Sequence, residues 1–223
     1  MAQPANPAIA KEVSIPPLGL GGILRVPNSP IGLVLFAHGS GSSRFSPRNQ
    51  MVADSLNRAG LATLLFDLLT DDEARDRRNV FDIALLGDRL AQATTWAGAD
   101  RSTGFLPLGY FGASTGAAAA LAAAGRANSP VVAIVSRGGR PDLAGAHLRS
   151  VHAGTLLIVG GKDEVVLALN RAAFDRLTCE KQLAIVAGAS HLFEESGALE
   201  RVIELTRDWF LGQMQQPHAS TDR

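Results

Sequence analysis

The chain has 223 residues, of which 46% are hydrophobic and 19% charged, and its formal net charge is zero. This composition is typical of a globular protein, and we expect a single domain with one sizeable core over residues 1–223. Neither half is strongly basic or acidic, so we expect neither nucleic acid nor a membrane surface as a partner.

The sequence also lacks the features of a signal peptide, a membrane span, a disulfide or a structural zinc site. Residues 1–10 lack the charged and apolar regions of a signal peptide, and no apolar run has the length of a membrane span. The single cysteine, Cys179, excludes an internal disulfide, and no Cys–His cluster suggests structural zinc. We therefore expect a cytoplasmic protein with no metal or organic cofactor and with flexible ends at residues 1–10 and 213–223.

Apolar runs predict the strands, in chain order. Two short strands joined by a proline-rich turn come first, and the later runs are continuous enough to be buried on both faces of a sheet. The predicted strands are residues 12–15, 20–26, 32–37, 61–66, 105–110, 131–135, 155–159 and 183–186.

Helices are predicted between several of these strands. Ser46 can cap a helix with Pro47 in its first turn and Gly60 beyond its end. The charged residues 70–78 read as a surface loop, and a long amphipathic helix is expected to start at Asn79. Two further helices are expected, an alanine-rich one over residues 117–124 and a strongly periodic one over residues 199–210.

This alternation predicts an α/β fold with a mostly parallel central sheet and helices on both faces. Ligands of such sheets bind outside the carboxyl ends of the strands, so residues that directly follow each strand are the candidates for function.

The segment from Gly112 to Gly116 follows a predicted strand and precedes the alanine-rich helix. Its sequence, Gly-Ala-Ser-Thr-Gly, matches the G-x-S-x-G turn that lifts a nucleophilic serine above a sheet, here Ser114. Side chains at the two glycine positions would collide with the neighbouring strand and helix. The pattern alone fits a tight turn of small residues equally well, so a base and an acid elsewhere must decide.

Asp163 and His191 supply these two groups, because each follows a later predicted strand. The order Ser, Asp, His is that of the α/β-hydrolases and differs from the orders in chymotrypsin and subtilisin. We expect His191 to be the general base for Ser114 and Asp163 to orient its imidazole. Glu164 and Asp142 remain alternatives for the acid.

An oxyanion formed on attack needs backbone N–H donors. We expect one from Thr115, directly after the nucleophile, and one from the loop after residues 32–37, where Ser40 is favoured and Gly41 is the substitute. His38 starts this loop and is expected to tie it down by hydrogen bonds; it and Gly41 are also candidate substrate contacts.

Four arginines follow predicted strand ends, namely Arg44, Arg48, Arg137 and Arg140. Guanidinium groups suit carboxylate recognition, which raises the hypothesis of an acidic group on the substrate, with Arg44 and Arg137 as contacts. The favoured alternative is that these arginines pair with Asp67, Asp142 or Glu194 and hold the loops in place.

Together these motifs resemble the α/β-hydrolase superfamily over residues 31–210, and most closely its dienelactone-hydrolase-like members. The resemblance rests on the segments His38-Gly39-Ser40-Gly41, 112–116, Gly160-Gly161-Lys162-Asp163 and Gly188-Ala189-Ser190-His191. It implies the α/β-hydrolase fold and ester chemistry. Dienelactone hydrolases proper have a cysteine nucleophile, whereas Ser114 stands here, so the resemblance does not carry dienelactone over as substrate.

The sequence therefore predicts a serine carboxylesterase that works through an acyl-enzyme. Only residues 137–154 separate two predicted strands at the position where lipases insert a helical lid, so we expect no lid domain and an open site for small soluble esters. Thioesterase or amidase activity on the same triad, or a non-catalytic protein that binds a ligand or partner, are the alternatives. A monomer or a homodimer would both fit.

Overall fold

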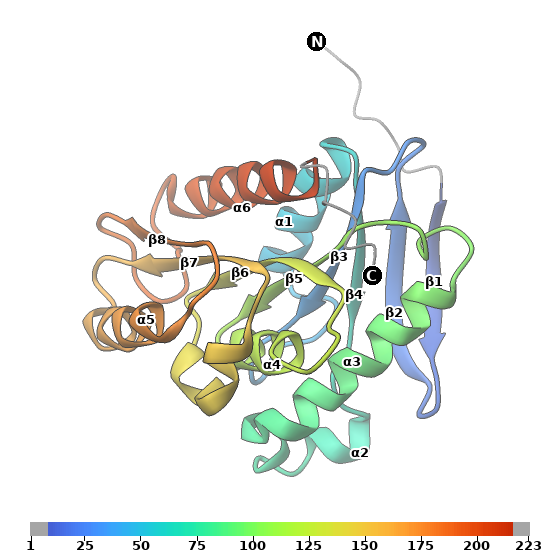
Figure 1. Ribbon diagram of the computed structural model, residues 1–223, viewed down its shortest axis with the longest axis horizontal. Coiled ribbons are helices and arrows are strands. Elements are labelled where there is room, and N and C mark those ends of the chain that lie inside the picture. Colours follow the sequence, from blue (N-terminus) through green and yellow to red (C-terminus); the bar gives the residue numbers. More distant parts are fainter. Residues whose placement is uncertain (1–8, 216–223) are drawn as a thin grey trace.

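The computed structural model describes residues 9–215 and places eight strands in one sheet (Figure 1). Their order across the sheet is β1-β2-β4-β3-β5-β6-β7-β8. All neighbouring pairs from β4 to β8 are parallel, and β2 is antiparallel to both β1 and β4. The strands are β1 (Ile9–Ile15), β2 (Leu20–Val26), β3 (Gly32–Ala37), β4 (Leu61–Phe66), β5 (Leu108–Ala113), β6 (Val131–Arg137), β7 (Gly154–Gly160) and β8 (Lys181–Val186).

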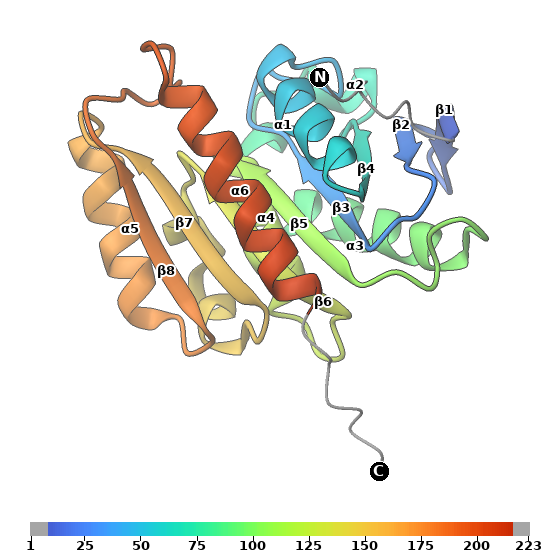
Figure 2. The same ribbon diagram turned by 90° about the horizontal axis from the view of Figure 1, so that it is seen from above.

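Helices cover both faces of the sheet, as the alternating pattern predicts (Figures 1 and 2). On one face lie α1 (Pro47–Arg58) and α6 (Ala198–Met214), and on the other α3 (Ile83–Ala99), α4 (Thr115–Ala124) and α5 (Glu164–Arg176). Three short elements lie in the connections: α2 (Asp71–Ala74) and the 3₁₀ segments η1 (Asn79–Phe81) and η2 (Pro141–Ser150). Each face has its own cluster of buried apolar side chains, so the sheet separates two layers of core.

The central helix α4 explains the alanine-rich run. All ten of its residues are buried, and its neighbours include α3, η2 and the sheet. Small side chains let these elements approach closely around a helix that has no solvent-exposed face. The composition of this run therefore reflects packing as well as helix propensity.

Several element boundaries differ from those that the sequence predicts. Strand β5 begins at Leu108, three residues later than expected, and Phe105 lies outside it with 70% of its surface exposed. The long helix starts at Ile83 and not at Asn79, because the Asp82 side chain caps it by accepting from the Leu85 N–H at 3.0 Å. The expected surface loop 70–78 contains the helix α2, whose capping box joins Thr70 and Glu73.

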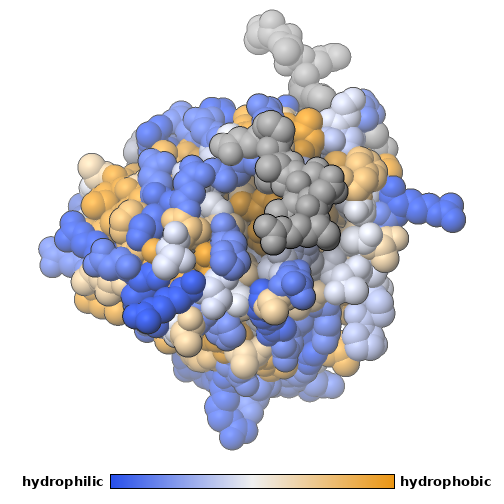
Figure 3. All heavy atoms as spheres, viewed as in Figure 1, coloured by the Kyte–Doolittle hydropathy of each residue, from blue (hydrophilic) through white to orange (hydrophobic). Residues whose placement is uncertain are grey.

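The two ends of the chain were expected to be flexible over residues 1–10 and 213–223. Residues 1–8 and 216–223 lie outside the described part, whereas Ile9 already belongs to β1 and α6 continues to Met214. Within residues 9–215, no helix combines the length and the apolar character that crossing a membrane requires. Hydrophilic and hydrophobic residues are interspersed on the face drawn in Figure 3.

Candidate active site

Ser114 occupies the sharp turn between β5 and α4. Its backbone has φ 52° and ψ −120°, a conformation that L-residues rarely adopt. A Cβ atom at Gly112 would overlap the backbone of Ala117 in α4, and one at Gly116 would overlap the carbonyl group of Ala37 at the end of β3. Both glycines are therefore required by close backbone contacts on either side of the turn.

Asp163 and His191 lie together at the carboxyl edge of the sheet. His191 Nδ1 is 2.7 Å from Asp163 Oδ2, and the Asp163 and His191 side chains are 16% and 40% exposed. Asp163 stands at the N-cap position of α5, yet its side chain makes no cap hydrogen bond there. Aspartate at this position commonly accepts from the helix backbone, so this carboxylate is committed to the imidazole instead.

The other two candidate acids have different surroundings. Asp142 accepts from Arg140 Nε at 2.9 Å and from Arg140 Nη2 at 2.8 Å, in a bidentate pair. Glu164 is the first residue of α5, next to the cap. Asp163 is the carboxylate that the structure brings to His191.

Residues at the end of β6 and directly after it contact both the serine turn and His191. Ser114 N–H donates to the Arg137 carbonyl at 3.2 Å, and the next residue, Gly138, faces His191. A Cβ atom on Gly138, which has φ +51°, would lie 3.6 Å from His191 Cε1. Glycine at this position therefore suits both the positive φ and the close approach of His191.

The predicted oxyanion donors Ser40 and Thr115 are adjacent. Ser40 N–H donates to Thr115 Oγ1 at 3.2 Å, so the loop after β3 is attached to the start of α4. A Cβ atom on Gly39 would lie 3.0 Å from Ser114 Cβ, which shows how closely this loop approaches the turn. Gly41 adopts φ +69°, and apart from its chain neighbours no described residue has an atom within 4 Å of the Cβ position built on it.

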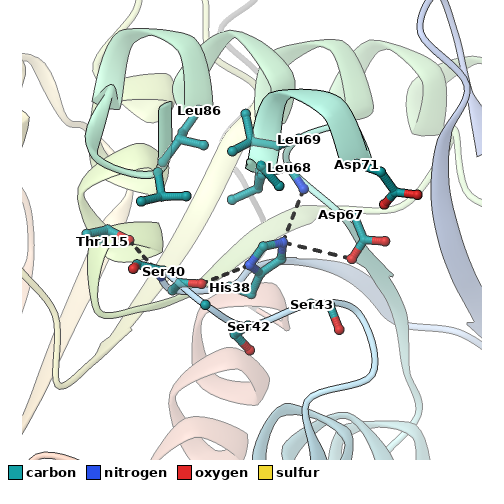
Figure 4. A pocket seen from close by; sticks show the side chains of 14 residues that line it. His38, Ser40, Ser42, Ser43, Asp67, Leu68, Leu69, Asp71, Leu86 and Thr115 are labelled. Atoms are coloured by element: carbon teal, nitrogen blue, oxygen red, sulfur yellow. Dashed lines mark hydrogen bonds and ion pairs between the residues drawn. The ribbon is translucent and has the colours of Figure 1, made fainter. Parts of the chain in front are cut away.

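The imidazole of His38 holds the same loop in place by hydrogen bonds. Leu68 N–H donates to His38 Nε2 at 3.2 Å, and His38 Nδ1 lies 3.0 Å from the Gly39 carbonyl oxygen (Figure 4). An Nε2 that accepts must be unprotonated, so we assign the proton to Nδ1, which donates to the carbonyl. Burial lowers the pKa of His38, against smaller opposing effects of the Gly39 carbonyl and Asp67, and favours this neutral form.

A cavity of about 180 Å³ opens beside Ser40 and Thr115. The loop from His38 to Ser43 forms one side, and the apolar side chains of Leu68, Leu69 and Leu86 lie on the other (Figure 4). Val80 of η1 also lines it. The apolar wall was not predicted. Leu68, Leu69 and Val80 flank the residues that read as a charged surface loop, and Leu86 comes from the first turn of α3.

Three of the four arginines form ion pairs. Arg44 pairs with Asp67, Arg48 Nη1 lies 3.2 Å from Glu194 Oε1, and Arg140 pairs with Asp142. Arg44 and its neighbours thus hold loops around the site, and Arg44 does not line the cavity.

Arg137 is different. Its Nη1 is buried and has no hydrogen-bond partner among residues 9–215, while its guanidinium carbon lies 5.8 Å from the centre of the Phe111 ring. Burial, with a smaller repulsion from Arg48, lowers the pKa of Arg137 to about 10. Arg137 is thus the one arginine of the four with no carboxylate partner among residues 9–215, and burying a cation without such a partner is costly.

Residues 9–215 contain no group of three or more histidine, cysteine, aspartate or glutamate side chains arranged to hold a metal ion. Cys179 is half-buried beside the start of β7, at the opposite end of the strands from the serine turn, where its Sγ lies 3.7 Å from Thr155 Oγ1.

The topology and the serine turn define the class as the α/β-hydrolase fold. A solved structure named dienelactone hydrolase, from Anabaena variabilis, is 53% identical, with a TM-score of 0.88 over 92% of this chain and 97% of that one. An alpha-beta serine hydrolase homologue from Coxiella burnetii is 18% identical, with a TM-score of 0.74 over 91% of this chain and 97% of that one, and supports the fold alone. The chain belongs to the dienelactone-hydrolase-like α/β-hydrolases.

A curated relative from Mycobacterium tuberculosis, with the provisional name phosphoribosyl transferase, is 55% identical over 219 residues. The match covers 97% of this chain and 49% of the relative, so the chain spans about half the length of the curated relatives it matches. No protein-family model matches the chain.

Proposed function

We propose that the protein is a serine hydrolase that cleaves small carboxylic esters through an acyl-enzyme. The observation that carries this proposal is the 2.7 Å pair of His191 Nδ1 and Asp163 Oδ2, which leaves His191 Nε2 for a nucleophile. Ser114 is the nucleophile in this proposal, because its turn presents the hydroxyl at the same sheet edge. Family membership supports hydrolysis.

In the proposed reaction Ser114 Oγ attacks the ester carbonyl while His191 Nε2 takes its proton. Asp163 holds Nδ1–H and stabilises the imidazolium. The negative oxygen of the tetrahedral intermediate accepts from the Thr115 amide, and from the Ser40 amide once that amide turns from Thr115 Oγ1. His191 then protonates the leaving alkoxide. Water, deprotonated by His191, releases the acid and restores Ser114.

A fluorophosphonate probe tests the nucleophile. We expect one covalent label per chain in the wild-type protein and none in Ser114→Ala. Ser102→Ala, in a surface turn before β5, is the matched control and should keep the label. An unlabelled wild-type protein, or a label that survives Ser114→Ala, would overturn the proposal in favour of a non-catalytic binding protein.

A panel of matched esters, thioesters and amides decides among the reactions that one triad can perform. We expect the oxygen esters to have the highest kcat/KM. A thioester or amide preference of tenfold or more would replace esterase by thioesterase or amidase. Ribosyl transfer is not part of the proposal, because half of the M. tuberculosis relative lies outside the match and the glycine-rich loop after β3 lacks the G-x-G-x-x-G and P-loop patterns.

We further propose that Arg137 favours an acidic group on the alcohol part of the ester. Arg137 is the last residue of β6 and lies on the same side of β5 as His191, which must protonate the leaving alkoxide. The wild type should hydrolyse an ester whose alcohol carries a carboxylate with a higher kcat/KM than its neutral analogue. Arg137→Ala should lose this preference. Arg149→Ala, at an exposed position, is the control; an equal preference in all three proteins would contradict this part of the proposal.

A further inference from the structure

The cavity beside Thr115 and the acid–base pair lie on opposite flanks of the turn that carries Ser114. In the sheet order β4-β3-β5-β6-β7-β8, Ser114 follows the central strand β5. The loops after β3 and β4 line the cavity on one flank. Asp163 and His191 follow β7 and β8 on the other flank.

This division assigns the two halves of an ester. In the proposed function the imidazole of His191 must reach the leaving oxygen to protonate it, so the alcohol part lies on the β6–β8 flank. The oxyanion points between the Ser40 and Thr115 amides. The remaining substituent of the tetrahedral carbon is the acyl chain, and the direction left for it is toward the cavity.

Leucine and valine side chains line much of this cavity, and the charges at its edge are acidic. Leu68, Leu69 and Leu86 face the serine-rich loop, whereas Asp67 and Asp71 lie at the end away from Thr115 (Figure 4). Asp67 is already paired with Arg44, and no lysine or arginine is among the described residues that line the cavity. A carboxylate on the acyl chain would meet apolar walls and like charge there.

We propose that this cavity is the acyl subsite, that it takes an uncharged apolar acyl group of about four to six carbons, and that Val80 sets the upper limit. The inference rests on the proposed function. An apolar cavity of about 150 Å³ accommodates a benzene ring, and this one, at 180 Å³, is slightly larger.

Val80 is the best-placed wall residue to limit chain length. It lies on η1, within the short segment that joins β4 to α3, and it is only half-buried. Leu69 and Leu86 are at most 8% exposed and belong to the main core, so truncating them costs stability as well as shape. Val80 packs against that core as a partly buried residue, so a change there alters the cavity at a smaller cost in stability.

The test compares two ester series that differ in one part only. The acyl series consists of p-nitrophenyl acetate, butyrate, hexanoate and octanoate, and the alcohol series consists of acetate esters of methanol, butanol and hexanol. The proteins are the wild type, Val80→Phe and Val80→Ala. Val132→Ala is the matched control, because Val132 is a half-buried valine at the start of β6, away from the site.

We expect Val80→Phe to lower the ratio of kcat/KM for hexanoate over acetate by about tenfold, since one methylene in an apolar pocket is worth about tenfold or more. Val80→Ala should raise the ratio for octanoate over butyrate about threefold or more. The ratios within the alcohol series should not change in either variant. Mono-p-nitrophenyl succinate, which carries a carboxylate on its acyl chain, should react at least about tenfold more slowly than the butyrate in the wild type.

Two failures are distinguishable. In the first, the wild type hydrolyses the esters while the Val80 variants change the kcat/KM ratios of the alcohol series, or of neither series. That result overturns the acyl subsite and leaves the esterase proposal standing. If the wild type hydrolyses no ester and takes no fluorophosphonate label, the proposed function is overturned together with the subsite. Equal rates for the succinate and butyrate esters would overturn the uncharged acyl group.

Discussion

At the scale of single residues, two side chains of the candidate site occupy positions that cost local stability. Ser114 has a positive φ that its Cβ disfavours, and Asp163 leaves the first turn of α5 without the side-chain cap it could provide. Each cost is of the order of 1 kcal/mol. Local strain and an unused cap at two residues of the proposed triad support the proposed catalytic roles.

The strain at Ser114 predicts an unequal effect of two small substitutions. Glycine adopts φ near +52° without penalty, whereas alanine keeps the unfavourable Cβ contact. We expect the free energy of unfolding of Ser114→Gly to exceed that of Ser114→Ala by about 1 kcal/mol, even after the larger chain entropy of glycine in the unfolded state. Urea unfolding of both variants measures the difference, and a less stable glycine variant would show that the turn is unstrained.

His38 predicts a pH dependence of stability. Burial keeps its pKa in the folded protein below the unfolded value near 6.5, so the folded form resists the proton that the unfolded chain takes up. The stability contributed by neutral His38 is therefore complete above pH 6.5 and is lost as the pH falls from there through the folded pKa.

Urea unfolding between pH 7.5 and 5 should show this loss in the wild type. The slope of the free energy of unfolding against pH should become shallower in His38→Gln, because glutamine does not titrate. It should be unchanged in His152→Gln, which replaces an exposed histidine. Unchanged slopes in His38→Gln would indicate that the loop after β3 tolerates the charged imidazole.

At the scale of elements, the site depends on how closely β3, β5 and α4 approach one another. The two glycines of the serine turn lie where backbone meets backbone, and all of α4 is buried behind them. These contacts bring the Thr115 hydroxyl to the Ser40 amide and thereby fix the predicted oxyanion loop relative to Ser114. The geometry of the site is thus a consequence of element packing as much as of the site residues themselves.

Gly116→Ala tests this packing. Its Cβ would overlap the Ala37 carbonyl, a backbone group that cannot move without shifting β3, so we expect a loss of about 3 kcal/mol in the free energy of unfolding and of most activity. Gly212→Ala in α6 is the matched control. Apart from the local helix backbone, no atom of residues 9–215 lies within 4 Å of its added Cβ, and the helix propensity of alanine should stabilise it by up to about 1 kcal/mol. Equal stability of the two variants, measured by urea unfolding, would contradict the close contact.

Elements with a complete local signal were predictable from the sequence. The strands over residues 20–26, 32–37 and 61–66 have the bounds that their apolar runs predict, and α1 has Ser46 as its cap, accepting from the Asn49 N–H at 3.4 Å. β3 and β4 are buried on both faces, which makes their apolar runs unambiguous, whereas β2 alternates between buried and partly exposed residues. The candidate triad was equally accessible, because the rule of strand ends selects Ser114, Asp163 and His191 without any knowledge of side-chain contacts.

Elements that depend on tertiary contacts were not predictable in the same way. Phe105 looks like part of a strand, but Pro107 follows it, and pairing with β3 begins only at Leu108. The helix α2 was missed although Thr70 and Glu73 carry the capping-box pattern, because the segment lacks an apolar stripe. The cavity wall was missed for a related reason. Val80 and Leu86 line a cavity only when the chain between β4 and α3 folds back over the loop after β3.

At the scale of the whole molecule, one sheet divides two apolar cores. Tyr110 and Leu157 belong to the core under α3, α4 and α5, and Phe111 and Ile158 to the core under α1 and α6. Alternate residues of the same strands serve opposite cores, so neither core can form without the sheet. The candidate site lies at the end of this sheet and depends on both.

This arrangement predicts that the chain unfolds as a single cooperative unit. Trp96 of α3 packs against one core and Trp209 of α6 against the other, so the two tryptophans report separately on the two faces. In Trp96→Phe the fluorescence reports on Trp209, and in Trp209→Phe it reports on Trp96. We expect the fluorescence midpoint of each variant to equal that variant's own midpoint by far-UV circular dichroism. Midpoints that differ from the circular dichroism transition in either variant would mean that the faces unfold separately, and the expectation of one domain over this chain would then be wrong.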